Sequence, residues 1–236
     1  MYYEPGGQPG SIPHNLPYDP FKACVVPRPI GWISTISATD PNMHNIAPYS
    51  QFNNLTFDPP YVLFSANQKP DSQRKDTVRN AERTGKFCWN LATWDLREAV
   101  NISAQQVEYG VDEFERAGLE KEYSRALPGE RVPMVNDSPV KFECVYHTTL
   151  RLPANPPMGT VDVVIGRVVA VHIQDHVLTD GKLDIAKTQP IARCGYFQYA
   201  VIRETFEMII PGMDEVTHAG LEGSSAIHKK IQNARW

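Results

Sequence analysis

A run of β-branched residues from Val161 to Ile173 restricts the fold of this chain more than any other feature. Valine and isoleucine pack well on the pleated surface of a strand and lose rotamer freedom in a helix. The preceding residues 140–147 largely alternate between apolar and polar side chains, which is typical of a half-buried strand. Gly166 interrupts the long run and indicates a β-bulge or a close backbone approach. Two long strands in succession favour a β-rich fold.

Shorter segments of similar composition predict further strands. Asp180-Gly181 is typical of a two-residue hairpin turn. Pro27 and Pro29 interrupt one segment, which is either two short strands or one bent strand. The additional strands are predicted at residues 23–37, 45–53, 61–66, 86–92 and 191–202. Because strands and helices do not alternate regularly, we expect a mainly β, antiparallel barrel with Greek-key-like topology and short helical insertions.

Capping residues predict where these helices begin. Asp76 is placed to cap a helix that Thr77 opens, and Gly85 is placed to end it in the left-handed conformation. Asp95 is placed to cap a second helix, whose apolar residues recur at a spacing of three to four. Residues 112–115 resemble a capping box ahead of a single helical turn.

The two ends of the chain differ from its middle. Five prolines in residues 1–20 disfavour helix and sheet, so we expect an extended N-terminal arm that either wraps over a partner subunit or lies loose. Residues 21–205 form the predicted barrel domain. Residues 206–236 are a predicted C-terminal extension, which is Gly-rich and polar after Pro211 and weakly ordered unless a partner holds it.

Composition narrows the choice of partners and location. The 236 residues carry a formal charge of −4 and no long run of Lys or Arg, which disfavours nucleic acid and anionic membranes as partners. No apolar run matches a membrane helix or a signal peptide, so the expected location is cytoplasmic. The four cysteines lie far apart in sequence without a C-x-x-C pair, and we expect reduced, buried thiols and no metal site.

The stretch from Arg28 to Thr77 carries the strongest functional signal. Near its end Ser72, Arg74, Lys75 and Thr77 surround a predicted helix start, where unpaired N–H groups and the helix dipole favour an anion such as a phosphate. A carboxylate beside a phosphate is repulsive, so Asp76 is assigned to capping. The alternative interpretation is a solvated, well-capped helix start.

Seven segments together resemble the flavin reductase-like family of FMN-binding split barrels. The similarity extends from about residue 21 to residue 203 and rests on the order and spacing of the segments. They are RPI at 28–30, WIST at 32–35, NIAPYS at 45–50, KDT at 75–77, FCWNL at 87–91, DEFERAGL at 112–119 and VIGRVVAVH at 164–172. The resemblance implies an antiparallel split barrel, a homodimer, and an FMN cofactor near the subunit interface, with FAD as the alternative flavin.

The same resemblance implies a set of cofactor-binding residues. One group would line the flavin, a second would contact the isoalloxazine, largely through backbone atoms, and a third would surround the phosphate. In that order they are Trp32, Ser34 and Thr35; Asn45, Ala47, Tyr49 and Ser50; and Ser65, Arg74, Lys75, Asp76 and Thr77. The implied activity is that of a flavin-dependent oxidoreductase, with hydride transfer from NADH or NADPH through bound FMN to a small-molecule acceptor. No catalytic residue is assigned, because flavin itself carries the electron chemistry.

One position departs from the family pattern. Reductase partners of two-component monooxygenases carry a Gly-Asp-His segment before the last long strand, and Val161 stands where that histidine would lie. Either nicotinamide binds differently here, or NADH and NADPH are not the natural donors. The alternative functions are a non-catalytic FMN-binding redox carrier or sensor, or a split barrel that binds no flavin or a different cofactor. His147, His172 and His176 are interpreted as structural or surface residues. Glu108 and Tyr109 are candidates to reach a neighbouring active site.

Overall fold

The structure is a computed structural model that describes residues 1–5, 9–69, 73–155 and 159–234. It divides into two units, residues 1–203 and residues 204–236, and each is described here by itself. None of the helices in the described ranges combines the length and apolar character needed to cross a membrane.

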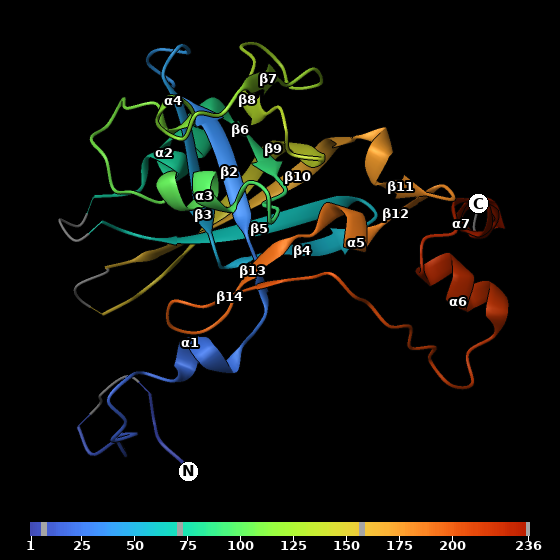
Figure 1. Cartoon of the computed structure of the whole chain (residues 1–236), viewed down its shortest axis with the longest axis horizontal. Coiled ribbons are helices and arrows are strands. Elements are labelled where there is room, and N and C mark those ends of the chain that lie inside the picture. The colour runs from blue at the N-terminus through green and yellow to red at the C-terminus, as the bar shows by residue number, and fades with distance from the viewer. Residues whose placement is uncertain (6–8, 70–72, 156–158, 235–236) are drawn as a thin grey trace. The chain divides into compact units, whose positions relative to one another are not determined.

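A seven-stranded antiparallel sheet forms the body of the first unit (Figure 1). In spatial order its strands are β3 (His44–Tyr49), β2 (Gly31–Ile36), β6 (Lys86–Asn90), β9 (Val140–Leu152), β10 (Val161–Ile173), β5 (Pro60–Asn67) and β4 (Phe52–Phe57). The predicted mainly β, antiparallel architecture is confirmed. The predicted strand at 45–53 proves to be two strands, β3 and the start of β4, because the chain turns at Ser50 and Gln51.

Three smaller sheets complete the unit. The first joins β1 (Arg28–Pro29), β13 (Ile191–Arg193) and β14 (Tyr199–Val201), and the others pair β7 (Lys121–Tyr123) with β8 (Pro133–Val135) and β11 (Leu178–Thr179) with β12 (Lys182–Leu183). The single last strand predicted at 191–202 is wrong, because a turn containing Tyr196, with φ of 55°, separates β13 from β14. Pro27 and Pro29 divide the first segment as expected, leaving the short β1 before β2.

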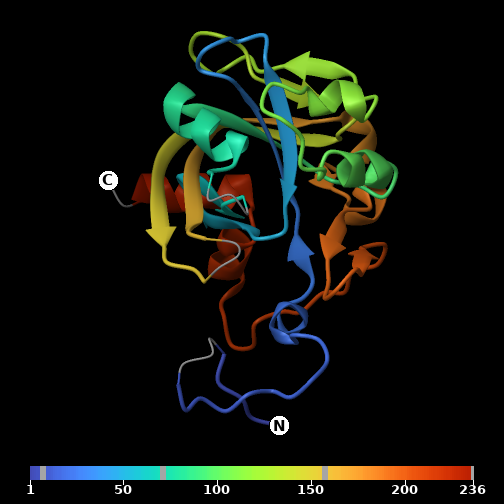
Figure 2. The same cartoon turned by 90° about the vertical axis from the view of Figure 1, so that its left-hand side faces the viewer.

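Two glycine predictions are confirmed. Asp180 and Gly181 have φ of 51° and 74° and turn the chain from β11 into β12. The two long yellow to gold strands β9 and β10 lie side by side (Figure 2). Their register shifts between Ile165 and Gly166, which is a β-bulge. A Cβ atom at Gly166 would lie 2.4 Å from the Phe87 ring. Only glycine therefore fits at the point where β10 crosses the core.

Short helices cover parts of the barrel. They are α1 (Phe21–Cys24), α2 (Asp76–Thr84), α3 (Arg97–Ile102), α4 (Glu113–Arg116), the 3₁₀ helix η1 (Asp175–Val177) and α5 (Ile185–Thr188). Figure 1 shows α2 and α3 beside β2 and β3. Gly85 ends α2 in the left-handed conformation, as predicted, and its N–H donates to the Ala81 carbonyl. Asp112 caps α4 by accepting from the backbone N–H groups of Phe114 and Glu115.

Two predicted caps are wrong. Asp76 is the first residue of α2, not its cap, and the cap position belongs to Lys75, which makes no side-chain capping bond. The Asp76 carboxylate turns instead to Lys69 and Arg79. Asp95 does not cap α3, whose cap position is Leu96.

Aromatic and β-branched side chains fill the interior of the barrel. Phe64, Phe87 and Val164 are fully buried in one cluster, and Trp32 and Phe114 in another. All four cysteines are free. Cys88 and Cys144 are buried as expected, but Cys24 is exposed and Cys194 is partly exposed, which corrects the expectation of four buried thiols.

The C-terminal unit contains two helices, α6 (Glu215–Leu221) and α7 (Ser225–Ala234). Asp214 caps α6 by accepting from the Thr217 N–H at 2.9 Å. The sequence-based expectation of a weakly ordered tail missed both helices, although Asp214 is a typical capping residue.

Candidate functional site

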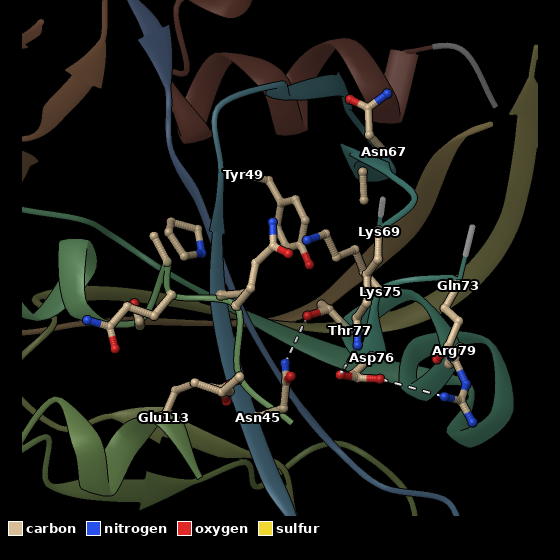
Figure 3. A pocket seen from close by; sticks show the side chains of 18 of the residues that line it. Asn45, Tyr49, Asn67, Lys69, Gln73, Lys75, Asp76, Thr77, Arg79 and Glu113 are labelled. Atoms are coloured by element: carbon tan, nitrogen blue, oxygen red, sulfur yellow. Dashed lines mark hydrogen bonds and ion pairs between the residues drawn. The ribbon is translucent and has the colours of Figure 1, made fainter. Parts of the chain in front are cut away.

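A pocket of about 640 Å³ lies at one end of the barrel, where β3, β5 and the start of α2 meet the segment after α3. This volume lies within the range of about 300–1,000 Å³ that is typical of small-molecule sites. Its lining residues are Asn45, Ala47, Pro48, Tyr49, Ser50, Gln51, Ser65, Ala66, Asn67, Lys69, Gln73, Lys75, Asp76, Thr77, Arg79, Ser103–Tyr109 and Glu113. Figure 3 shows the labelled α2 residues to one side of Asn45 and Glu113 to the other.

Cationic side chains gather where α2 begins. Lys69 Nζ lies 3.1 Å from Asp76 Oδ2, and Arg79 Nη1 lies 3.7 Å from Asp76 Oδ1. The Asp76 carboxylate is therefore paired with two cations, which reduces the repulsion it would exert on a bound anion. Lys75 lines the same wall. Together with the N-terminal dipole of α2, these cations favour an anionic group.

Buried amide and hydroxyl groups fix α2 against the sheet. Asn45 Nδ2 donates to Thr77 Oγ1 at 2.8 Å, and Asn80 Nδ2 donates to Thr35 Oγ1 at 3.1 Å. All four side chains are at least nine-tenths buried. The position of the helix start relative to β3 is thus set by directed hydrogen bonds as well as by packing.

Glu113 places a carboxyl group on the opposite wall. It is the first residue of α4, only 7% exposed, and its Oε2 accepts from the Ile46 N–H at 3.1 Å. Burial raises the pKa of Glu113 to about 7, and the carboxylates of Asp112 and Asp76 contribute in the same direction. This carboxyl group therefore exchanges a proton near neutral pH.

Eight of the twelve expected cofactor-binding residues line this pocket. They are Asn45, Ala47, Tyr49, Ser50, Ser65, Lys75, Asp76 and Thr77. The structure brings them together from β3, β5 and α2, which lie far apart in sequence. Burial raises the pKa of the Tyr49 hydroxyl, which therefore stays protonated. Ser72, at the start of the basic stretch, lies outside the described residues.

The other four expected residues are not part of the lining. Trp32, Ser34 and Thr35 are fully buried on β2. Trp32 Nε1 donates to Ser103 Oγ at 2.9 Å and Ser34 Oγ donates to the Pro133 carbonyl at 2.6 Å. Of these two partners, Ser103 lines the pocket, so the Trp32 contact holds part of its wall.

Arg74, the fourth of these residues, is engaged in an ion-pair cluster. Its guanidinium nitrogens lie 2.6 and 2.7 Å from the two Glu82 oxygens, and Nε donates to Asp162 Oδ2 at 3.0 Å. The Asp162 side chain is 2% exposed. Arg74 therefore compensates a buried carboxylate and does not line the pocket.

Sequence reasoning missed several lining residues. Arg79 follows Asp76 by three positions, so helical spacing places both on one face and was a usable signal. The sequence pattern places Glu113 only within a capping box, because its contact with Ile46 depends on tertiary packing. Glu108 and Tyr109 line this chain's own pocket, where Tyr109 and Ser37 share a hydroxyl hydrogen bond of 2.6 Å.

The three histidines singled out in the sequence lie outside the pocket. His172 Nε2 lies 2.7 Å from Glu143 Oε1, His147 packs edge-on against Tyr61, and His176 is exposed in η1. Glu143 also accepts from three backbone N–H groups of residues 125–127. In the described part of the chain, no cluster of three or more His, Cys, Asp or Glu side chains is arranged to hold a metal ion.

Residues 23–188 match the model of the flavin reductase-like domain. The chain belongs to the flavin reductase-like family. A protein of Aquifex aeolicus is 34% identical over 172 residues, which are 72% of this chain and 82% of the relative. A second relative, from Halalkalibacterium halodurans, is 30% identical over 207 residues, or 88% of this chain and 97% of the relative. Both are described as uncharacterised proteins.

Solved structures of the family share the fold. Component B of nitrilotriacetate monooxygenase from Bacillus cereus has a TM-score of 0.72 and 29% identity, and the match covers 80% of this chain and 90% of that one. Flavoredoxin of Desulfovibrio vulgaris has a TM-score of 0.67 and 17% identity, with 80% and 93% covered. Membership of the family supports a flavin-related redox function, and the split-barrel fold is confirmed.

The pocket has the donor groups that a phosphorylated flavin needs. The cations at the start of α2 suit a phosphate, and Ala47, Pro48 and Val107 offer apolar surface to a flat ring. Asn45, and Ser50 and Gln51 in the turn after β3, also line the pocket and offer polar groups to the ring edge. The residues present therefore fit an FMN group.

Proposed function

We propose that this protein binds FMN in the pocket between β3 and α2 and acts as an oxidoreductase with NADH or NADPH as electron donor. The observation that carries the proposal is the joint placement of Lys75, Thr77 and Arg79 at the start of α2, beside the β3 segment that contains Asn45. FAD is the alternative flavin.

Each wall of the pocket has a separate task in this proposal. Lys75 and the N-terminal end of α2 would hold the phosphate, with Lys69 and Arg79 neutralising Asp76 beside it. Asn45 and the backbone of β3 would orient the ring. Bound flavin supplies the acceptance and release of a hydride, so the protein needs only to bind, orient and shield the reactants.

We assign proton transfer to the carboxyl group of Glu113. Its Oε2 is already engaged by the Ile46 N–H, so Oε1 is the atom that would carry the proton. A pKa of about 7 lets this carboxyl group give up and regain a proton under the same conditions. Its place in the pocket lining lets it serve the reacting ligands.

A fluorescence titration with FMN tests the binding part of the proposal. Lys75→Ala should weaken FMN while leaving riboflavin, which lacks the phosphate, nearly unaffected. Equal weakening of both ligands would contradict the phosphate assignment. Steady oxidation of NADH or NADPH by the FMN-loaded protein under air tests the enzymatic part.

A second candidate function is that of an FMN-binding redox carrier or sensor without its own turnover. The observation that favours it is Val161, which stands where the reductases of two-component systems carry a histidine. Flavoredoxins among the structural neighbours are consistent with this alternative. A carrier should bind FMN as tightly as an enzyme would, but it should oxidise NADH and NADPH only slowly.

We also propose that the protein is a homodimer, as the family resemblance implies. Val169, Val171 and Ile173 alternate along β10 and share one face, and each is more than two-fifths exposed. A second copy of the chain would remove this apolar strip from water. Light scattering should give twice the chain mass, and Val171→Lys should shift the mass toward the monomer.

A further inference from the structure

A second pocket of about 380 Å³ adjoins the proposed flavin pocket. Both pockets are lined by Pro48, Ser50, Gln51, Asn67 and Ala104, so the turn after β3 separates them and contributes to each. A ligand in the second pocket would therefore lie next to a ligand in the first. We call this second cavity the basic pocket.

The charge of the basic pocket differs from that of its neighbour. Lys22, Arg28 and Arg193 line it, and Asp19 is its only carboxylate among the described lining residues. The flavin pocket balances Lys69, Lys75 and Arg79 against three carboxylates. A net excess of cationic side chains in a cavity attracts anionic ligands.

Arg28 is held in place by the backbone around it. Its guanidinium donates to the carbonyls of Val25 at 2.7 Å and Cys194 at 2.9 Å, and also to that of Lys22. Its Nε is buried and has no hydrogen-bond acceptor within the described residues. A buried cationic donor without an acceptor is costly unless a ligand or solvent satisfies it.

Arg193 lies directly opposite Arg28 in the β1–β13 strand pair. Its guanidinium lies over the Tyr199 ring at 4.6 Å and donates to the Tyr196 carbonyl. Stacking leaves the remaining N–H groups of a guanidinium available to a carboxylate or phosphate. The two arginines are thus neighbours on paired strands, and backbone carbonyls hold both guanidinium groups.

The N-terminal arm completes the wall. A Cβ atom at Gly195 would lie 2.4 Å from Ala23 Cβ, so α1 packs directly on the turn between β13 and β14. Tyr18 and Tyr196 also meet, with ring centroids 5.8 Å apart. The end of the arm therefore brings Asp19 to the cavity, and α1 brings Lys22.

From this geometry we propose that the basic pocket binds the anionic group, a carboxylate or a phosphate, of the molecule that exchanges electrons with the flavin. The inference rests on the proposed function, because it requires flavin in the adjoining pocket. The shared chemistry admits two sources, the phosphates of a nicotinamide dinucleotide and the carboxylate of an organic acceptor.

Calorimetry on the FMN-loaded protein tests the proposal with four probes. NAD⁺, NADP⁺ and 4-nitrobenzoate carry anionic groups and do not reduce the oxidised flavin, and 4-nitrobenzamide is the uncharged match of 4-nitrobenzoate. We expect Arg193→Gln to weaken at least one anionic probe by about tenfold and Lys22→Gln to weaken it by about threefold. Lys182→Gln removes an exposed charge from β12 and should leave the affinities of all four probes unchanged.

The pattern of losses identifies the source of the anion. A loss of affinity confined to NAD⁺ and NADP⁺ assigns the pocket to dinucleotide phosphates, and a loss confined to 4-nitrobenzoate assigns it to carboxylate acceptors. Unchanged affinities in both Arg193→Gln and Lys22→Gln, or equal losses for 4-nitrobenzamide, would overturn the proposal. FMN affinity, measured first, should stay within about twofold in every variant. Failure of FMN to bind the wild type would instead overturn the proposed function itself.

Discussion

Asn45 on β3 donates a hydrogen bond of 2.8 Å to Thr77 in the first turn of α2. Asn45 is 8% exposed and Thr77 is 1% exposed, so water does not compete for either group. The bond joins the strand proposed to orient the flavin ring to the helix start proposed to hold its phosphate. One side-chain contact thereby sets the relation between the two halves of the site.

A double-mutant cycle on this pair should reveal strong coupling. Thr77→Val keeps the side-chain shape but leaves Asn45 without its acceptor, which should cost about 1–2 kcal/mol of unfolding free energy. Asn45→Leu combined with Thr77→Val should cost less than the sum of the single changes, with a coupling of about 1 kcal/mol. Urea denaturation measures all four proteins. Additive effects would mean that the bond contributes nothing to stability.

Lys75→Ala should weaken FMN binding by about 2 kcal/mol, or about thirtyfold, because a charge-assisted hydrogen bond to the phosphate is lost. Arg83→Ala is the matched control, since Arg83 is an exposed cation in the last turn of the same helix. Flavin fluorescence quenching gives both dissociation constants. If the two variants bound FMN equally well, Lys75 would have no special relation to the phosphate.

Arg74→Met should lower stability with little effect on FMN. Removing the guanidinium leaves the buried Asp162 with Arg151 as its remaining cationic partner and deprives Glu82 of its two Arg74 contacts, at a cost of about 2 kcal/mol at neutral pH. Hydrogen bonding from Arg74 lowers the pKa of Glu82 below its usual 4.5, so the stabilisation is present above that value and fades as pH falls through the folded-state pKa. Denaturant titrations at neutral and acid pH test this trend. A large loss of FMN affinity would contradict this account and indicate that Arg74 binds the phosphate.

Glu113→Gln should change how stability depends on pH. The folded protein holds the Glu113 proton more tightly than the unfolded chain, because burial raises the pKa from 4.5 to about 7. Wild-type stability therefore includes a contribution that is present below pH 4.5 and is lost as pH rises to about 7. Glutamine stays neutral and can still accept from the Ile46 N–H. In thermal melts, the stability of the variant relative to that of the wild type should rise between about pH 5 and about pH 8.

Parallel pH profiles for the two proteins would contradict the raised pKa of Glu113. Asp112 is the natural comparison, because it lies next in sequence and its pKa is lowered. Burial opposes the charge of Asp112, but the His44 ring 3.5 Å away and hydrogen bonds from Lys121 and the Phe114 N–H outweigh it. Asp112→Asn should therefore lower stability relative to the wild type at neutral pH, because the ion pair with Lys121 is lost.

Local signals in the sequence were sufficient for much of the fold. The β-branched run on β10, the bulge at Gly166 and the turn at Asp180-Gly181 all follow from backbone preferences of neighbouring residues. The cap at Asp112 does so as well. The split of residues 191–202 was missed because an apolar, aromatic strand pattern gives no sign that Tyr196 adopts a positive φ.

Site residues within one recognisable sequence segment could be predicted. Site residues that depend on tertiary packing were harder to predict. Asn45 and Thr77 carry polar groups in a recognisable segment, and both line the pocket. Arg74 has the same chemistry as its neighbour Lys75, but only the fold brings Glu82 and Asp162 to it. Glu113 reaches the pocket because α4 packs against β3. Sequence spacing contains no information on such contacts.

The most direct test of the central claim is the visible absorption spectrum of the FMN-loaded protein before and after addition of NADH or NADPH without oxygen. We predict that flavin bands persist through gel filtration and then bleach rapidly with one of the two donors. Persistent bands that neither donor bleaches would contradict the assigned donor and leave an FMN carrier. Loss of all flavin during gel filtration, with no quenching in a titration, would contradict the binding site itself.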